Sequence, residues 1–459
     1  MKNKIMLLTG ICSVLLMVCA FQIKNDQHHN ESKWTKLFDG KSFNGWKVLG
    51  GEADFVIEDG AIVGISKVNT PNTFLCTEKT YSNFILELDL KIEDETSNSG
   101  VMIRGQYDST RNRIYGYQVE ADAKERAWSG GIYDESRRGW LYPLSLNPNA
   151  RKAFHLGEYN RYRIEVIGRE IKTWVNGVPV AYLVDETDQK GNIGLQVHNI
   201  LDVKAHEGRK TYFKNIRIQT ENLTPLPFEP GHFVVSTVDN TLTDYEIQDG
   251  WKLLFTGHNS LGWSDVDLQG FPKEGWIIEN GELSIMESDG SESMTYGNIV
   301  TLEQYAAFDL SFQFKLSKGA NSGLKYFVTL EEKTEGSAIG LEYQILDDKV
   351  HPDAIKGKNG NRTLASLYDL IPSKKQYTKR IGEWNQGRIV VHPNNHVEHY
   401  LNGTKVLEYD RGSNEFQDLV SGSKYKGWKN FGQAPKGHLL LQDHGNHVSY
   451  KSIKIKKLD

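Results

Sequence analysis

Hydrophobic and polar residues alternate with a period of two along most of this chain. The clearest runs are Phe84, Leu86, Leu88 and Leu90 in the first half and Phe308, Leu310, Phe312 and Phe314 in the second. A period of two places successive side chains on opposite faces of a strand. No window of about 11 or more residues keeps the stripe of an amphipathic helix. The pattern therefore predicts an all-β protein.

The same pattern of strands and turns occurs twice. Corresponding stretches follow one another in the same order, namely 34–46 and 251–263, 55–64 and 276–285, 81–104 and 305–327, 163–180 and 388–406, and 191–198 and 437–445. Asp-Gly and Asn-Gly pairs separate several of the strands and are the strongest short-range hairpin signal. We also expect each Asn-Ser-Gly triplet to form a turn. Short strands joined by tight turns favour two tandem antiparallel β-sandwiches of the concanavalin A-like jelly-roll kind.

Chain length and the repeat divide the sequence into domains. A chain of 459 residues suits two domains of about 200 residues, each large enough to bury a core. We predict the first jelly-roll repeat over residues 34–220 and the second over residues 232–459. Residues 221–231 contain three prolines without alternation, which indicates a semi-rigid linker.

The N-terminal residues predict export. Residues 1–20 combine lysines, an apolar run and small residues before the end, as a signal peptide does. The run is short for a transmembrane anchor, and the polar residues 21–33 read as a flexible tether. We therefore expect an exported protein, periplasmic or extracellular. Cys19 leaves lipoprotein attachment open, although Val18 stands where a lipobox prefers Gly, Ala or Ser.

Composition narrows the classes of function. The formal charge is −5 and the basic residues are scattered among acidic ones, so no broad surface for nucleic acid is expected. A content of 11% aromatic residues with 43 glycines suits turn-rich β modules. The chain has no βαβ unit to carry a dinucleotide fingerprint, so we expect no nicotinamide cofactor.

One strand carries a carboxylate and an amide on the same face. In the sequence GLEYQILDD, residues 340–348, Glu342 and Gln344 point one way while Tyr343 and Ile345 point the other. Side chains two residues apart on a strand lie roughly 7 Å apart, close enough to hold one small polar ligand. For a single Glu-x-Gln, a half-exposed sheet face is the simpler explanation, and it is the repeat and the neighbouring motifs that favour a ligand site. A weaker copy, GYQVEAD, occupies the same place in the first repeat.

With the repeat established, the chain resembles the 3-keto-disaccharide hydrolase domain family in tandem copies. The resemblance is carried in both halves and in the same order by LFDGKSFNGW, NSG, the Y-Q strand, G-E-[WY]-N, [VL]-N-G, L-Q-x-H and F-[RK]-N-I. It implies a concanavalin A-like or laminin G-like jelly roll. The family name implies cleavage of glycosides whose sugar has already been oxidised at C3.

The implied substrate permits a route different from ordinary glycoside hydrolysis. A ketone at C3 acidifies the C2 hydrogen, so a base can form an enolate that expels the C1 substituent, and water then adds back. Net hydrolysis without elimination is the other route. Enolate formation needs a base, a cation, metal or donor at the enolate oxygen, and an acid for the leaving group. No cofactor is required by the sequence, a divalent metal is possible, and a separate sugar 3-oxidoreductase has to make the ketone.

Candidate site residues are dense in the second repeat. We predict Glu342 or His444 as the base and Lys325 as the group that stabilises developing negative charge. The predicted contacts to a carbohydrate substrate are Gln344, Asp348, His351, Tyr368, Trp384, Asn385 and Gln442. Among these, Trp384 could stack on a pyranose, and Asp348 with His351 could bind a metal. An insertion at residues 411–433 is expected to cover a cleft of either repeat.

The first repeat offers an alternative site formed by Arg104, Gln118, Glu120 and His198. We align Gly116 with Glu342 and place Arg104 near the counterpart of Phe327, so the cation would lie on a different strand residue. An arginine suits an enolate or another oxyanion. Which repeat is catalytic stays open at this point.

A non-catalytic carbohydrate-binding protein is the alternative function, because jelly rolls also serve as lectins. A cell-surface adhesion module has only the fold to support it. Catalysis requires a titratable group with a perturbed pKa in the cleft, whereas a lectin needs neutral donors and an aromatic platform.

Overall fold

The computed structural model of the protein describes residues 34–288, 297–334, 337–374, 378–428 and 431–458. The predicted signal peptide, the tether and Cys19 lie outside the described residues. The chain folds as two compact units, with the boundary between Val235 and Ser236. None of the helices in the described residues has both the length and the apolar character needed to cross a bilayer.

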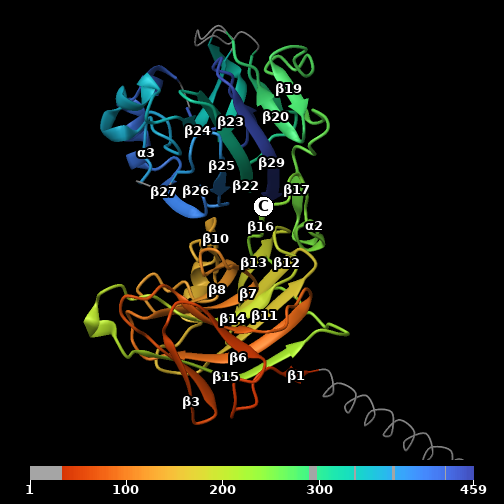
Figure 1. Cartoon of the computed structure of the whole chain (residues 1–459). Helices are drawn as coiled ribbons and strands as arrows, with labels where there is room; N and C mark the ends of the chain where they lie inside the picture. Colours follow the sequence, from red (N-terminus) through yellow and green to blue (C-terminus); the bar gives the residue numbers. More distant parts are fainter. Residues whose placement is uncertain (1–33, 289–296, 335–336, 375–377, 429–430, 459) are drawn as a thin grey trace, which may run out of the picture. The chain divides into compact units, whose positions relative to one another are not determined.

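The first unit consists of two antiparallel sheets (Figure 1). One sheet has the order β16 (Val235–Ser236), β13 (Val178–Val184), β12 (Glu170–Val175), β11 (Asn160–Ile167), β6 (Phe84–Ile92), β15 (Lys210–Gln219), β4 (Ala61–Ile65) and β3 (Asp54–Glu58), with β1 (Thr35–Lys36) beside β15. The other has the order β10 (Gly139–Tyr142), β9 (Ile132–Glu135), β8 (Arg113–Asp122), β7 (Asn98–Asp108), β14 (Asn192–Val197), β5 (Thr73–Thr77) and β2 (Trp46–Gly50).

The second unit repeats this plan. Its larger sheet has the order β19 (Trp276–Glu279), β20 (Glu282–Ile285), β29 (Val448–Lys457), β22 (Phe308–Leu316), β25 (Trp384–Val391), β26 (His396–Leu401) and β27 (Thr404–Asp410), with β17 (Trp251–Leu253) beside β29. Its smaller sheet has the order β18 (Trp263–Asp265), β21 (Ile299–Thr301), β28 (His438–Leu441), β23 (Asn321–Thr334) and β24 (Ser337–Leu346). The prediction of two tandem antiparallel β-sandwiches is confirmed.

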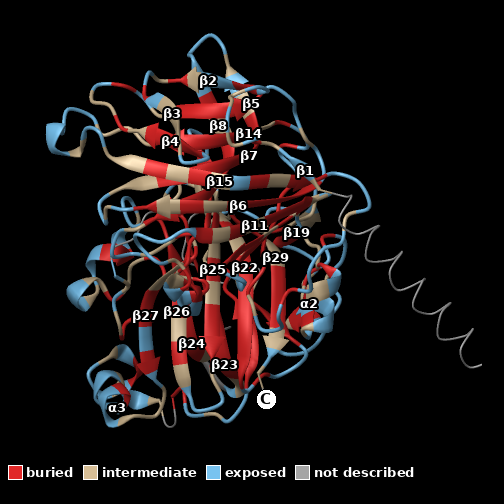
Figure 2. Ribbon diagram, turned by 90° about the horizontal axis from the view of Figure 1, so that it is seen from below, coloured by how far each residue is buried: buried red, intermediate tan, exposed pale blue. Residues whose placement is uncertain are grey.

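Helices in the described residues are short. They are α2 (Asp244–Gln248), α3 (Asn414–Ser421) and the 3₁₀ turns η1 (Pro148–Lys152), η2 (Lys204–His206), η3 (Pro352–Ile355), η4 (Lys358–Gly360) and η5 (Lys424–Gly427). Helix α2 begins with a capping box in which Thr243 and Glu246 satisfy each other's backbone N–H groups. Helix α3 begins at the cap residue Ser413 and lies beside β27 (Figures 1 and 2).

The core of the second unit lies between its two sheets. Phe308, Leu310, Phe312 and Phe314 on β22 are buried, as the alternation predicts, and belong to one cluster with Leu324, Tyr343 and Ile345 of the smaller sheet. Figure 2 shows buried positions concentrated along β22, β25 and β29. Because Tyr343 and Ile345 point into this core, their neighbours Glu342 and Gln344 point to the opposite face of the smaller sheet.

Two local predictions differ from the structure. Asn-Ser-Gly does not form a turn, because Asn98 and Asn321 each open a long strand, β7 and β23. The proline-rich segment is more than a spacer, since Phe228 is buried and its ring meets Trp174 and Tyr182 edge to face. An aromatic side chain anchors this segment to the first unit.

Candidate active site

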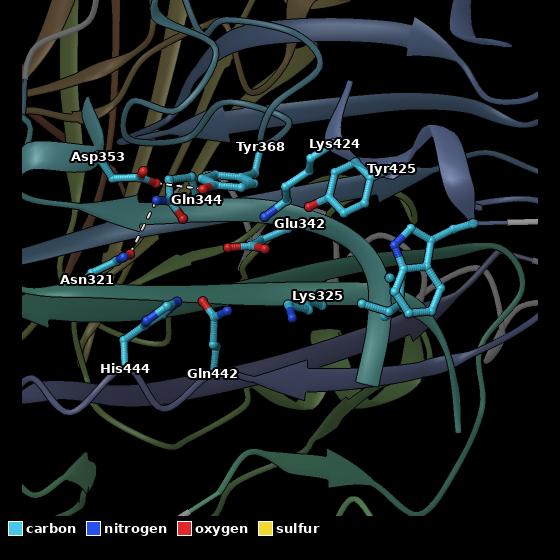
Figure 3. A pocket seen from close by; sticks show the side chains of 13 residues that line it. Asn321, Lys325, Glu342, Gln344, Asp353, Tyr368, Lys424, Tyr425, Gln442 and His444 are labelled. Atoms are coloured by element: carbon cyan, nitrogen blue, oxygen red, sulfur yellow. Dashed lines mark hydrogen bonds between the residues drawn. The ribbon is translucent and has the colours of Figure 1, made fainter. Parts of the chain in front are cut away.

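A hollow of about 330 Å³ opens on the outer face of the smaller sheet in the second unit (Figure 3). It is lined by six of the residues predicted from sequence, namely Lys325, Glu342, Gln344, Tyr368, Gln442 and His444. It is also lined by polar and aromatic residues that the sequence did not single out as site residues, namely Asn321, Asp353, Lys424, Tyr425 and Trp428. Segments far apart in the chain therefore meet in one cavity.

The floor of the hollow is the ladder between β23 and β24. Lys325 pairs with Glu342, and Gly323 pairs with Gln344. A Cβ atom added at Gly323 would lie 2.5 Å from Glu342 Oε1 and 3.0 Å from Gln442 Oε1. The glycine of Asn-Ser-Gly is therefore needed because the Glu342 and Gln442 side chains lie over its backbone.

Glu342 is a buried carboxylate, with 5% of its surface exposed. Burial raises its pKa, while the positive charges of Lys325 and Lys424 act in the opposite direction. Gln344 lies between Asn321 and Glu342 (Figure 3). With its amide turned, its nitrogen donates to Glu342 Oε1 over 3.0 Å and to the carbonyl oxygen of Ser322 over 3.1 Å. The carboxylate is thus held by an amide on its own strand.

Two lysines act electrostatically on Glu342 from different parts of the chain. Burial lowers the pKa of both Lys325 and Lys424, and the charge of Glu342 partly offsets this effect. Lys325 Nζ donates to the carbonyl oxygen of Ala338 over 3.3 Å. Lys424 Nζ lies 4.1 Å from the ring centroid of Tyr368. The site therefore places the Glu342 carboxylate near two lysine side chains in a largely desolvated space.

His444 lies on the same side of the hollow as Gln442 (Figure 3). Burial, followed by the charges of Lys325, His351 and Lys424, lowers the pKa of His444 to about 4. An imidazole with so low a pKa is neutral at pH 7 and is a weak base. Of the two bases predicted from sequence, Glu342 is therefore the stronger candidate.

Hydrogen bonds to Asp353 orient Tyr368. The Tyr368 hydroxyl donates to Asp353 Oδ2 over 2.6 Å (Figure 3). Arg362 donates to Asp353 and to Asp369, over 3.2 and 2.7 Å. Burial raises the pKa of Tyr368, and Asp353 raises it further. This network fixes the phenol as a neutral group on the wall of the hollow.

The segment with α3 and η5 forms the remaining wall and supplies Lys424, Tyr425 and Trp428. We call residues 411–428 the strap. Phe416 stacks on Tyr409 at 5.6 Å, and the backbone N–H of Lys424 donates to Asp369 Oδ2. The strap covers the site of its own repeat. The sequence indicated these three residues only through their position in the segment that is inserted in the second repeat.

Trp384 and Asn385 lie elsewhere, so the prediction that they contact a sugar in this site is wrong. Both belong to β25 of the larger sheet. The Trp384 ring lies 4.7 Å from Lys315 Nζ and 4.1 Å from Lys451 Nζ. Asn385 Oδ1 accepts hydrogen bonds from Lys379 N and Asn402 Nδ2, so it fixes a turn.

Asp348 and His351 do not line the hollow. Asp348 Oδ1 accepts from the backbone N–H of Leu364 over 2.7 Å, and burial raises the pKa of Asp348 to about 6. His351 Nδ1 accepts from Asp353 N and caps η3. In the described part of the chain, three potential metal ligands gather instead at His396, Glu398 and Glu408. Lys405 already donates to both of these glutamates.

The strand register corrects the alignment of the two repeats. Met102 pairs with Gln118, and Gly100 pairs with Glu120, just as Lys325 pairs with Glu342 and Gly323 with Gln344. The counterpart of Glu342 is therefore Gln118 and not Gly116, while Glu120 corresponds to Gln344. The order of carboxylate and amide is reversed between the repeats, and Met102 stands in the place of Lys325.

Arg104 does not belong to the polar face of the first unit. Its guanidinium is buried and donates to the carbonyl oxygens of Ser82, Asp188 and Gly168. Its backbone φ is 47°, and its counterpart Phe327 has a φ of 53°. Both residues lie at a bulge, where one extra residue turns a side chain away from its expected face. The alternative site that includes Arg104 is wrong in this respect.

The fold and the hollow define a tandem β-sandwich protein with a buried carboxylate and two lysines at one site. The chain belongs to the family described as the 3-keto-alpha-glucoside-1,2-lyase-like domain, which matches residues 33–219 and 250–456. Both units are therefore copies of the same domain.

Several known proteins resemble this chain. A 3-keto-disaccharide hydrolase of Bacteroides thetaiotaomicron is 34% identical over 232 residues, which are 46% of this chain and 79% of that protein. A crystal structure of a candidate glycosyl hydrolase from Parabacteroides distasonis is 30% identical with a TM-score of 0.43, covering 48% of this chain and all of that one. A second one from the same organism is 26% identical with a TM-score of 0.36, covering 45% of this chain and 99% of that one.

Proposed function

We propose that the second unit is an enzyme that cleaves glycosides carrying a ketone at C3 of the sugar. Membership of the family and the likeness to a 3-keto-disaccharide hydrolase support a hydrolase-type enzyme. The observation that carries the proposal is the buried Glu342 carboxylate, whose pKa is raised and on which Lys325 and Lys424 act in the same hollow. A base and cations placed together suit the formation of an enolate.

Proton abstraction at C2 is the first step. Glu342 takes the C2 proton, and the electron pair of the C–H bond forms the C2=C3 enolate with negative charge on the C3 oxygen. A carboxylate in a desolvated site is a stronger base than one in water, because burial disfavours its charge. Lys325 stabilises the enolate oxygen electrostatically, and low solvent access strengthens this interaction.

Elimination at C1 is the second step. The enolate electrons return to form a C1=C2 double bond, the C3 ketone is restored, and the bond from C1 to the leaving oxygen breaks. The leaving oxygen takes a proton from Lys424, whose lowered pKa makes its ammonium a better acid. Water then adds across C1=C2: its oxygen bonds to C1 while it gives a proton back to Lys424, and Glu342 returns a proton to C2. Elimination followed by hydration therefore amounts to hydrolysis, and both residues regain their starting protonation states.

Neutral groups of the hollow position the sugar. Gln344 and Gln442 offer amides to its hydroxyl groups, and neutral His444 can donate or accept a hydrogen bond. Trp428 provides an apolar surface at the wall. Because an unoxidised sugar lacks the acidified C2 hydrogen, a separate sugar 3-oxidoreductase has to supply the substrate. The export of the protein stays a prediction from its N-terminal sequence.

The decisive experiment compares an oxidised glycoside with its parent. Purified full-length protein is incubated with a 3-keto glucoside and with the unoxidised glucoside, each with and without a chelator, and released aglycone is measured. We expect release from the 3-keto glucoside alone, and solvent deuterium should enter at C2. The chelator series measures whether a divalent ion takes part. If both sugars bind and no aglycone is released from either, the protein is a carbohydrate-binding protein and not an enzyme.

A further inference from the structure

The first unit also carries a row of polar side chains on its smaller sheet. Gln118, Glu120 and Gln196 are buried there and Asn98 is half-buried, although the face lies outside the sandwich core. Gln196 corresponds to Gln442, because Leu195 pairs with Val101 as Leu441 pairs with Leu324. The first unit has thus kept a polar face at the register of the proposed catalytic site.

Several polar atoms on this face have no protein partner. Among the described residues, Gln118 Oε1, both side-chain amide atoms of Gln196, and Trp128 Nε1 are buried and make no hydrogen bond. Gln118 is 1% exposed and Gln196 is fully buried. A buried polar group without a hydrogen bond costs roughly 1–3 kcal/mol, so native structures keep few of them. Donors and acceptors gathered on one face indicate a polar ligand that completes them.

The Glu120 carboxyl group adds to this set. Asn98 Nδ2 donates to its Oε1, and Gln118 Nε2 lies 3.3 Å from its Oε2. Burial raises the pKa of Glu120 to about 7. A carboxyl group in this range accepts or donates a hydrogen bond near neutral pH, as sugar hydroxyl groups require.

The first unit lacks the cation of the second at the equivalent position. Met102 occupies the place of Lys325 and packs in an apolar cluster with Phe74, Cys76 and Ile114. Without an ammonium group at this position, an enolate would lose the electrostatic stabilisation that Lys325 gives in the second unit. The face therefore carries polar groups suited to binding a sugar and lacks the lysine that the proposed chemistry requires.

Aromatic residues and a hollow border the polar row. The rings of Trp128 and Trp140 meet edge to face at 4.7 Å, and Arg126 lies over both at about 5 Å. A hollow of about 250 Å³ is lined by Asn98 and His198 among others. Asn98 connects this hollow to Glu120 through its hydrogen bond. Tyr133 pairs with Gln118 across the strands, and its ring meets that of Trp140 edge to face at 5.3 Å, so the indole rings lie on the side of the sheet that carries Gln118. Aromatic rings near amides are typical of sites for neutral sugars.

We propose that the first unit holds a second, non-catalytic site that binds a neutral pyranoside through Gln118, Glu120, Gln196 and the Trp128 indole. This site is independent of the chemistry proposed for the second unit. It would hold a glycan chain or a substrate close to the catalytic unit by keeping both on one polypeptide.

The test is a calorimetric titration of the full chain with methyl α-glucopyranoside and with trehalose. The background is the otherwise unchanged protein, because neither of these unoxidised sugars is a substrate of the proposed reaction. Gln196→Leu and Gln442→Leu are then compared, because these residues occupy equivalent registers in the two units. We expect Gln196→Leu to weaken the binding to the first unit about tenfold or more, since the lost amide makes its hydrogen bonds only to ligand. Gln189→Leu, an exposed glutamine of the same unit, is the matched control.

Thermal unfolding separates binding from a structural role. Because neither amide atom of Gln196 has a partner in the described residues, Gln196→Leu should leave the melting temperature unchanged or raise it. Loss of binding together with a lower melting temperature would mean that Gln196 is structural. Binding that only Gln442→Leu removes, or no binding of either sugar, would overturn the second site and leave the proposed function intact.

Discussion

The two units present the same ladder of residues with the carboxylate and the amide exchanged. In the second unit Glu342 lies beside Lys325, and Gln344 supports it. In the first unit Gln118 takes the place of Glu342, Glu120 takes the place of Gln344, and Met102 replaces Lys325. Moving a carboxyl group two residues along a strand shifts it by roughly 7 Å. The repeats therefore share an architecture and differ at the groups to which we assign the proposed chemistry.

This comparison separates what a sugar site needs from what an enolate site needs. Both faces keep the glutamine of the L-Q-x-H motif and a carboxyl group in a desolvated place. The second adds Lys325 and the strap, which contributes Lys424. The additional elements are the charged ones, and charge is what a developing enolate requires.

The largest effect is expected at the carboxylate of the second unit. Glu342→Gln should lower turnover of a 3-keto glucoside by about 10³- to 10⁴-fold, because it removes a general base. The fold and much of the sugar binding should be retained, since the amide has the same shape. Steady-state kinetics with circular dichroism measure both, and Glu274→Gln, at an exposed glutamate of this unit, is the control.

Exchanging the pair tests whether position matters beyond composition. The double variant Glu342→Gln with Gln344→Glu gives the second unit the order found in the first. Its turnover should stay as low as that of Glu342→Gln, because the carboxyl group is displaced along the strand from the proton that it must reach. Recovery of turnover would show that any carboxyl group on this face suffices.

The lysine on β23 is expected to have the next largest effect. Lys325→Met installs the residue of the first unit and should lower turnover about 10²- to 10³-fold, because it removes an electrostatic stabiliser. Since Lys325 lowers the pKa of Glu342, the variant should raise that pKa further. The acid limb of kcat/KM should therefore move to higher pH. If the acid limb of kcat/KM does not move, Lys325 does not influence the pKa of Glu342. Lys273→Met, at an exposed lysine of the same unit, is the control.

Glu120 makes the stability of the first unit depend on pH. Its pKa of about 7 in the folded state lies above the ordinary value of 4.5, so the folded state binds the proton more tightly. The contribution of Glu120 to the free energy of unfolding, about 3 kcal/mol, is therefore complete below pH 4.5 and is lost as pH rises through 7. Glu120→Gln should remove this dependence. Denaturant unfolding at pH 5 and 8 measures the difference, and Glu186→Gln should leave it unchanged.

The strap should give the smallest effect. Trp428→Ala removes an apolar wall that the sugar touches in both the ground and transition states, so KM should rise up to about tenfold while kcat changes little. Trp428→Phe should restore most of the affinity. A fall in kcat as large as that of Lys325→Met would instead indicate that the strap positions the charged groups.

Several site residues were accessible from sequence because they share a strand face. Glu342 and Gln344 follow from the period of two and from the burial of Tyr343 and Ile345. Lys325 and His444 followed from the order of motifs in the repeat. Trp384 and Asn385 were assigned wrongly, because a motif in sequence does not tell which sheet its strand joins.

Sequence by itself determined the two repeats, their strands and which side chains alternate, because these depend on local periodicity and turn residues. Tertiary structure alone decided which polar residues share a hollow. The sequence alignment of the two repeats was shifted by two residues, so that it matched Gly116 to Glu342. A bulge also turns Arg104 away from the polar face. Lys424 joined the site although it is distant in the chain, because packing of Phe416 on Tyr409 carries the strap there. Such contacts depend on pairing register and on the packing of loops, neither of which a local pattern specifies.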